Sequence, residues 1–352
     1  MDVLSDAVTA ARVGRPHSSR LVGKVPFAED FPAGEGCAGF HVVLQGSCLL
    51  LPREAEPVPL GVGDVVFLPT AAAHGLASAP AAPPGGTVVL LCGGYPMDQD
   101  RAHPLLTELP EIVRLPAKVG RDPSLQAVVE LLGQELDRAP TTEGDALPLL
   151  SGQARGVDGD GLPVLSGQED GRVPALGGGA PGGDAALPAL LDLLLLYILR
   201  AWLAEQSGGW AAALRDPAVD AALRAVHAEP ARPWTVEALG RQGGLSRAAF
   251  ARRFAALVGR PPLAYLTWWR LTSAARLLRD TEEPLTAIAA QVGYGSEHAL
   301  AHAFKREYGL APGVYRRTTG RTPLPSDPPE GSGALRRRGN REREGRQGPN
   351  VP

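Results

Sequence analysis

The segment WTVEALGRQGGLSRAAFARRFAALVGRPPLAYL spans residues 234–266, and PLTAIAAQVGYGSEHALAHAFKREYGLAPGVYRR spans residues 284–317. Each segment contains an apolar helical pattern, a turn with glycine, a serine and then a second helical pattern. Ser246 in the first segment corresponds to Ser296 in the second, and a phenylalanine follows eight residues after each serine. Two helices joined by such a turn form a helix-turn-helix unit, whose second helix enters the major groove of DNA. The sequence therefore predicts a reader of double-stranded DNA with two points of contact.

The first unit combines an apolar stripe with an outward face of small and basic residues. A Gly-Gly turn allows a sharp change of direction, and Ser246 is placed to cap the helix that follows. The N-terminal amides of that helix can bind a phosphate. Because the outward side chains are small, the helix can approach a groove closely, and Arg252 is the expected base reader. The candidate DNA-binding residues of this unit are Ser246, Arg247, Ala248, Ala251 and Arg252.

The second unit repeats this plan with a different outward face. Its candidate DNA-binding residues are Ser296, Glu297, His298, Ala301, His302 and Lys305. Ser296 is the expected helix cap. Since the face carries no arginine, we expect Lys305 to contact phosphate and the base readout to be weaker or more dependent on context.

An amphipathic helix is predicted at residues 262–279, between the two units. A helix of this length measures about 25 Å. It can hold two recognition helices roughly one DNA turn, about 34 Å, apart in successive major grooves. Its candidate core positions are Leu263, Leu266, Leu271, Ala274, Ala275 and Leu278.

Three motifs of the second unit carry a resemblance to a known family. They are AQVGY at residues 290–294, SEHALAHAFK at residues 296–305 and GLAPGVYR at residues 309–316. With them, residues 216–317 resemble the DNA-binding domain of the AraC/XylS family of bacterial transcription regulators. The resemblance places base-facing residues at Ala248, Ala251 and Arg252 in the first helix and at Glu297, His298, Ala301 and His302 in the second. Alanine stands at two first-helix positions where the family often has larger groups, which leaves Arg252, helped by Arg247, as the expected base reader.

Charge divides the chain into two parts. Residues 216–317 hold 14 Lys and Arg against 9 Asp and Glu, whereas residues 1–215 hold 14 against 25. A basic part behind an acidic part suits a polyanion-binding module joined to another domain, although ordinary surface variation gives the same asymmetry.

Cysteine usage and the apolar stretches bear on the compartment. Cys37, Cys48 and Cys92 are too scattered for a disulfide framework, which indicates a reducing cytosol. The first fifteen residues have no apolar core, so no signal peptide is expected. The apolar stretch at residues 187–204 is interrupted by an Asp and an Arg, which are costly in a bilayer. We therefore expect a buried or dimer-forming helix there, and a cytoplasmic protein.

Residues 20–96 have the pattern of a β domain. Short apolar runs alternate with Gly, Pro and Asp turns, which suggests a sandwich or barrel. GFHVVLQGS at residues 39–47 and GVGDVVFLPTAAAH at residues 61–74 resemble motifs of cupin barrels. The segment is similar to the cupin-type sensor domain that precedes this DNA-binding domain in one AraC subgroup. Residues 103–137 then have a helical pattern.

The candidate effector or sensor residues of this domain are His41, Gln45, His74 and Cys92. A metal-binding cupin presents several His and a carboxylate, but Val43 stands where a second His would be. Because two His do not close a metal site, neither a metal nor a cofactor is predicted. A small-ligand pocket without metal, a metal site and a filled barrel that only dimerises are the alternatives. Cys92 is either a redox-active thiolate or a buried small hydrophobe, and its apolar flank favours the second.

The expected fold is α+β and multidomain: a cupin-like β-barrel with a helical dimerisation segment, then an all-α domain with two helix-turn-helix units joined by a linker helix. The expected parts are a sensor domain at residues 1–137, a disordered Gly/Pro-rich insertion at residues 138–186, an apolar helix at residues 187–208 that packs on the sensor or dimer region, a DNA-binding domain at residues 214–317 and a disordered basic tail at residues 318–352.

The favoured function is that of a sequence-specific transcription regulator, not an enzyme, whose barrel senses a small molecule or a redox signal. The expected partners are promoter or operator DNA, an unidentified effector and a second copy of the chain in a homodimer, with RNA polymerase as a further candidate and no membrane. The alternatives are a cupin-type metal-dependent enzyme fused to a DNA-binding module, and an architectural DNA-binding protein without an effector.

Overall fold

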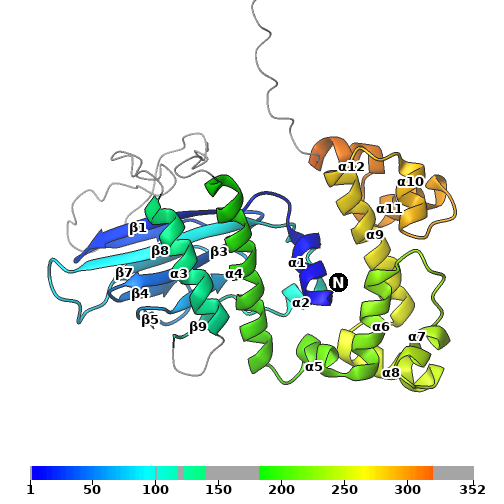
Figure 1. Ribbon diagram of the computed structural model, residues 1–352, viewed down its shortest axis with the longest axis horizontal. Helices are drawn as coiled ribbons and strands as arrows, with labels where there is room; N and C mark the ends of the chain where they lie inside the picture. Colours follow the sequence, from blue (N-terminus) through cyan, green and yellow to red (C-terminus); the bar gives the residue numbers. More distant parts are fainter. Residues whose placement is uncertain (1, 100, 118–122, 139–181, 320–352) are drawn as a thin grey trace, which may run out of the picture.

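The computed structural model describes residues 2–99, 101–117, 123–138 and 182–319. Most of the expected insertion and of the expected basic tail lies outside these residues. The described part contains a β domain and a helical domain, with helices α1 and α2 between them (Figure 1). The expected architecture, a cupin-like β domain followed by a helical domain with two helix-turn-helix units, is confirmed.

The β domain consists of two antiparallel sheets. The first sheet has the spatial order β1 (His17–Lys24), β8 (Thr87–Pro96), β3 (Cys37–Gln45), β6 (Val65–Leu68) and β9 (Val113–Leu115). The second has the order β2 (Ala28–Phe31), β7 (His74–Ser78), β4 (Cys48–Pro52) and β5 (Val58–Leu60). Alternation along β3 supplies two cores, because Val43 joins the cluster between the sheets whereas Phe40 and Val42 join the cluster under the helices.

Helices α3 (Pro123–Arg138) and α4 (Gly183–Glu205) pack against each other over the first sheet (Figure 1). Five α4 side chains are fully buried there, namely Leu191, Leu194, Leu195, Ile198 and Leu199. The hydroxyl of Tyr95 on β8 donates to the Leu191 carbonyl at 2.7 Å, which fixes α4 to the sheet. Within the described residues, 185–205 form the one helix long and apolar enough to cross a membrane, yet its buried face is that of a core helix.

Several boundaries differ from those expected. Helix α4 begins at Gly183 rather than at residue 187, and it ends at Glu205, three residues before the end of the part expected at residues 187–208. The helical pattern expected across residues 103–137 is wrong in part: α2 (Pro104–Thr107) is a single turn, and Val113–Leu115 pairs with β6 as a strand. The edge of β6 offers backbone hydrogen-bond partners to residues 113–115. This strand pairing prevails over the helical periodicity of the stretch.

An N-terminal helix, α1 (Val3–Ala11), was not anticipated. Asp2 caps it by accepting from the Ser5 amide at 3.0 Å, and its apolar residues are buried. The signal was present as apolar residues at helical spacing after an Asp, but the segment is short. This helix lies between the β domain and the helical domain (Figure 1).

The helical domain is built around one long helix. Its elements are α5 (Gly209–Arg215), α6 (Pro217–Ala228), α7 (Val236–Gln242), α8 (Arg247–Val258), α9 (Pro262–Asp280), α10 (Leu285–Gln291), α11 (Glu297–Tyr308) and α12 (Pro312–Thr319). Phe250 and Phe254 pack with the first part of α9, whereas Leu300 and Phe304 belong to a separate cluster on its second part. Leu263, expected in the core, is 42% exposed, and Tyr265 is buried instead.

Candidate functional site

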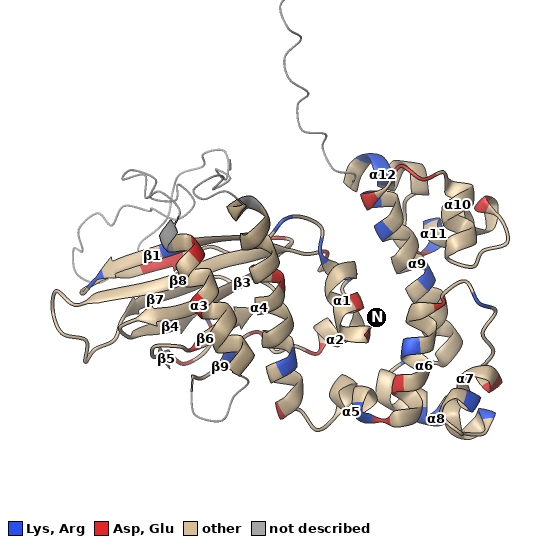
Figure 2. Cartoon of the chain, viewed as in Figure 1, with Lys and Arg blue, Asp and Glu red and all other residues tan. Residues whose placement is uncertain are grey.

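The second helix of the first helix-turn-helix unit, α8, projects its small and basic residues from the domain. Ser246 caps it by accepting from the Ala249 amide at 3.4 Å. Arg247, Ala248 and Arg252 are exposed, and Ala251 is half-buried. In Figure 2, Lys and Arg mark α8, α9 and α12. Four of the five candidate DNA-binding residues of the first unit are therefore exposed, and their contact with DNA stays a prediction.

The turn before α8 depends on its two glycines for different reasons. Gly244 has a φ of +69°, a conformation that side chains rarely adopt. Gly243 lies so close to α6 that an added Cβ would meet the Ala218 Cα at 2.3 Å. The first helix-turn-helix unit therefore needs one glycine for the turn and the other for contact with α6.

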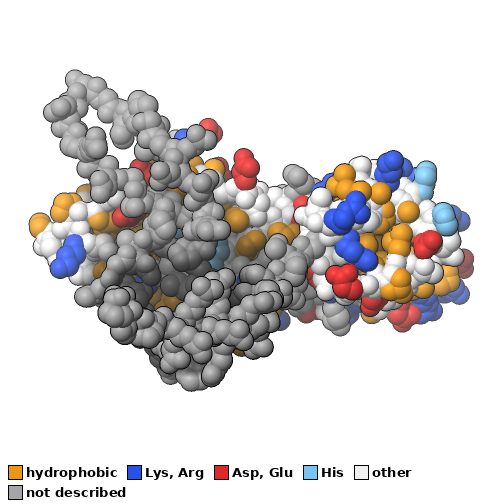
Figure 3. Space-filling model, turned by 90° about the horizontal axis from the view of Figure 1, so that it is seen from above, with side chains coloured by type: hydrophobic (Ala, Val, Ile, Leu, Met, Phe, Trp, Pro, Cys, Tyr) orange, Lys and Arg blue, Asp and Glu red, His pale blue; other side chains and the backbone are white. Residues whose placement is uncertain are grey.

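The corresponding helix of the second unit, α11, presents histidines and a lysine. Ser296 caps it by accepting from the Ala299 amide at 3.2 Å. His298, His302 and Lys305 are exposed, and Ala301 is half-buried. Figure 3 shows histidine side chains at the end of the molecule away from the β domain.

Glu297 differs from its neighbours on this face. Its carboxylate accepts from the Thr286 hydroxyl at 2.7 Å, and the residue is half-buried. The contact joins α10 to α11 within the second unit. Arg253 on α8 is held in a similar way, because its guanidinium bonds the carboxylate of Asp216, which also caps α6.

A cluster of neutral polar groups lies inside the β domain. His41 on β3 stands opposite Cys92 on β8, and its Nδ1 lies 3.0 Å from the Cys92 sulfur. Its Nε2 lies 2.7 Å from Nε2 of His74 on β7. The fourth candidate, Gln45, is exposed at the end of β3, so the structure unites three of the four expected residues. The sequence did not reveal Phe31, whose ring stacks on His74 with a centroid separation of 5.0 Å.

The hydrogen-bond directions in this cluster follow from one carbonyl. Nδ1 of His74 lies 2.7 Å from the Ala72 carbonyl oxygen, which can only accept, so this nitrogen carries the proton. Nε2 of neutral His74 then accepts from His41 Nε2, which leaves His41 Nδ1 to accept from the Cys92 thiol. Burial lowers the pKa of His41 to about 3 and also lowers that of His74, while it raises the pKa of the Cys92 thiol. The hydrogen-bonded cluster of His41, His74 and Cys92 is therefore uncharged.

This geometry is a poor fit to a metal ion. His74 and Cys92 contact opposite nitrogens of the His41 ring, so the three groups do not converge on one point. Apolar residues fill the space around them between the sheets, including Val43, Leu50 and Leu90. Two surface grooves, of about 710 and 510 Å³, lie beside α5 instead, one against α8 and the other against α1 and α4.

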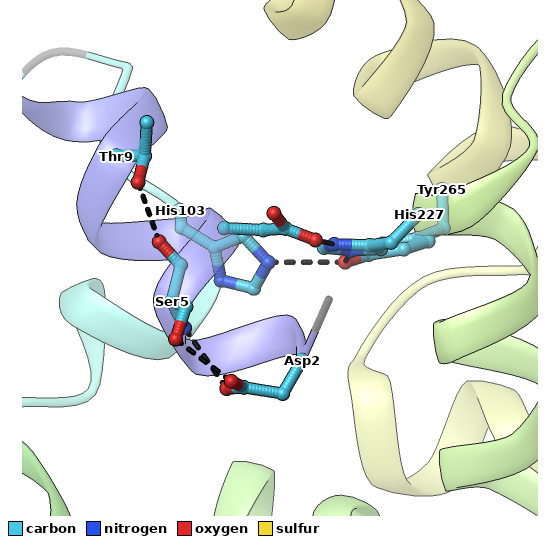
Figure 4. A network of polar contacts seen from close by, with 7 residues as sticks. Asp2, Ser5, Thr9, His103, His227 and Tyr265 are labelled. Carbon is cyan, nitrogen blue, oxygen red and sulfur yellow. Dashed lines mark hydrogen bonds and ion pairs between the residues drawn. The ribbon is translucent and has the colours of Figure 1, made fainter.

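A second polar chain joins the β domain to the helical domain (Figure 4). His103 caps α2 by accepting the Leu105 amide on Nδ1 at 3.1 Å, so its Nε2 carries the proton and donates to the Tyr265 hydroxyl at 3.0 Å. That hydroxyl donates to Nε2 of His227 at 2.7 Å, and Nδ1 of His227 donates to Asp6 at 2.9 Å. We call Asp6, His103, His227 and Tyr265 the junction network.

The junction network is buried among tryptophans. His227 stacks on Trp269 at 3.8 Å, and His103 meets the rings of Trp210 and Trp268 edge-on. Burial lowers the pKa of both histidines and raises that of Tyr265. The sequence did not reveal this network, because its four residues belong to different elements and only the fold brings them together.

Comparisons with known proteins agree with this division. A cupin family model matches residues 2–144, and a helix-turn-helix domain model matches residues 239–318. A putative AraC-like transcription regulator of Streptomyces antibioticus is 32% identical over 337 residues, which cover 90% of this chain and 99% of that protein. The RCS-specific HTH-type transcriptional activator RclR of Escherichia coli is 29% identical, and the match covers 79% of this chain and 83% of that protein. The crystal structure of the AdpA DNA-binding domain with a target DNA is 32% identical, covers 29% of this chain and 92% of that one, and gives a TM-score of 0.28.

Proposed function

This chain belongs to the family of AraC-like transcription regulators, and we propose that α8 and α11 read two successive major grooves of double-stranded DNA. The observation that carries the proposal is that two capped helices with exposed polar faces are mounted on one continuous helix, α9. This helix has 19 residues and is therefore about 28 Å long. Both recognition helices lie on the side of α9 away from the β domain, which leaves them open to DNA (Figure 1).

The two faces have unequal roles in this proposal. Arg252 donates to a base edge, and Arg247 supports it from the start of α8. Ala248 and Ala251 allow close approach of the helix. Ser246 and Ser296 present helix N-termini to phosphates. On α11, His298, Ala301 and His302 face bases, Glu297 acts from the edge of this face, and Lys305 contacts phosphate.

We further propose that the barrel is the sensor and that the His41–His74–Cys92 cluster is the part an effector perturbs. The effector is either a small ligand or a redox signal. One relative, RclR, is named an RCS-specific activator. The Cys92 thiol is buried, protonated and hydrogen-bonded to His41, which disfavours its reaction with an oxidant. We therefore favour a small ligand as the effector.

Assembly and partners belong to the same proposal. Leu131 on α3 and Leu193 on α4 are 47% and 41% exposed, on the two helices that cover the first sheet. We propose that they contribute to a homodimer of a cytoplasmic regulator that also contacts RNA polymerase. Sedimentation of the full chain over a range of concentrations tests the dimer, and a monomer throughout would contradict it.

The reading of bases is tested with DNA selected from a random library by the full-length protein. Arg252→Ala should weaken binding to the selected DNA by about 1–3 kcal/mol and relax preference at one base pair. Arg224→Ala is the control, because Arg224 is an exposed basic residue on α6. An equal loss on selected and random DNA would show that Arg252 touches only phosphate.

A further inference from the structure

A short segment between β8 and β9, residues 101–108, contacts both halves of the DNA reader. His103 donates to Tyr265 on α9, beside the first unit, and Glu108 accepts from the Trp210 amide of α5 at 3.0 Å. Arg101 donates to the Tyr308 carbonyl at 3.3 Å, at the last residue of α11. The segment follows β8, the strand that carries Cys92.

Arg101 makes two contacts with the end of the second recognition helix. Besides donating to the Tyr308 carbonyl, its guanidinium lies over the Tyr308 ring, 4.6 Å from the centroid. The last carbonyls of a helix have no partner within the helix and carry partial negative charge, so a cation stabilises them. A residue of the β domain thus acts as a C-terminal cap for α11.

Tyr308 also belongs to the second unit's core. It stacks on Phe304 with a centroid separation of 4.2 Å, and it meets Tyr315 of α12 at 5.3 Å. It is 6% exposed, so its position cannot change without moving these neighbours. A contact that fixes Tyr308 therefore fixes α11 as a body.

The other end of α11, at the turn that precedes it, is held by the first helix-turn-helix unit. Gly293, in the turn before α11, lies so close to the connection between α6 and α7 that an added Cβ would meet the Ala231 Cα at 2.7 Å. Arg270 of α9 secures that connection by donating to the Pro230 carbonyl at 2.7 Å. With its turn held there and its C-terminus held by Arg101, α11 is constrained at both ends.

From this arrangement we infer that Arg101 is a positioning residue for DNA recognition, which sets the orientation of α11 relative to α8. Without the guanidinium, α11 retains its turn contact and its seat on α9 but can tilt about them. The protein then accepts a range of distances between the two DNA half-sites instead of one. This inference rests on the proposed reading of two grooves.

The test selects DNA from a random library with the full-length protein and with Arg101→Ala, and compares the distances between paired half-sites. The wild-type protein should enrich one distance. Arg101→Ala should broaden the distribution and lower the preference for that distance by about tenfold, which corresponds to 1.4 kcal/mol. Arg101→Lys keeps the charge without the planar guanidinium, so it should restore only part of the preference.

Arg53→Ala is the matched control, because Arg53 is exposed in the same domain, between β4 and β5. A distribution for Arg101→Ala equal to that for Arg53→Ala would overturn the inference. So would an equal loss of affinity on all DNA at unchanged spacing, since it would show Arg101 acting only through its charge. If Arg101→Ala fails to fold, Arg101→Lys is judged against wild type by the same distribution. Failure of wild type to enrich any paired sites would instead refute the two-groove function.

Discussion

Tyr265→Phe is the sharpest test of the junction network, because it removes one oxygen and leaves the ring in place. The Tyr265 hydroxyl accepts from His103 and donates to His227, and Tyr265 is 0% exposed. In the variant, the His103 N–H and the His227 ring nitrogen lose their partners in a buried site. Each unsatisfied buried group costs about 1–3 kcal/mol, so for the two groups together we expect the free energy of unfolding to fall by about 2–6 kcal/mol.

The assay is urea denaturation of the full chain, followed by tryptophan fluorescence. Three of the five tryptophans, Trp210, Trp268 and Trp269, surround the network, so the junction contributes a large part of the signal. Tyr197→Phe is the control, because Tyr197 is a half-buried tyrosine of α4 outside the network. A loss below about 0.5 kcal/mol for Tyr265→Phe would refute the assigned hydrogen bonds, since that is the range of ordinary surface substitutions.

Two further predictions concern protonation and the barrel cluster. The folded protein holds the pKa of His41, His74, His103 and His227 below 6.5, chiefly by burial, whereas the unfolded chain binds protons near that pH. The free energy of unfolding is therefore retained above pH 6.5 and falls as the pH drops below it. The loss is about 1.4 kcal/mol per pH unit for each imidazole that the folded protein keeps neutral. Equal free energies of unfolding at pH 7.5 and 5.5 would contradict this. Cys92→Ala should leave the response of DNA binding to oxidants unchanged, and an oxidant-dependent shift in binding that the variant abolishes would reverse the assignment of a buried, inert thiol.

Helices α8 and α11 could be predicted from the sequence because the signals that define them lie close together in the chain. Caps, turn glycines and helical periodicity lie within a few residues of one another, so Ser246, Ser296 and the outward faces could be predicted. Leu263 was misplaced because it and Tyr265 both fit an apolar stripe of α9, and only the packed domain selects Tyr265.

The β domain and the junction were less accessible because their contacts are distant in the chain. His41 and Cys92 meet through strand register, which a single sequence does not specify, whereas Gln45 is exposed at the end of β3 and does not contact them. Residues 113–115 form a strand because an edge of the sheet is available to them. Asp6 and His227 are 221 positions apart, and no local pattern links them.

The most direct test of the central claim is hydroxyl-radical footprinting of the full-length protein on DNA that it has selected. We expect two protected regions whose centres are about one helical turn, or 34 Å, apart on one face of the duplex. Arg252→Ala should weaken protection in one region more than in the other. A single protected region, or two that weaken equally, would contradict a reader that places α8 and α11 in successive major grooves.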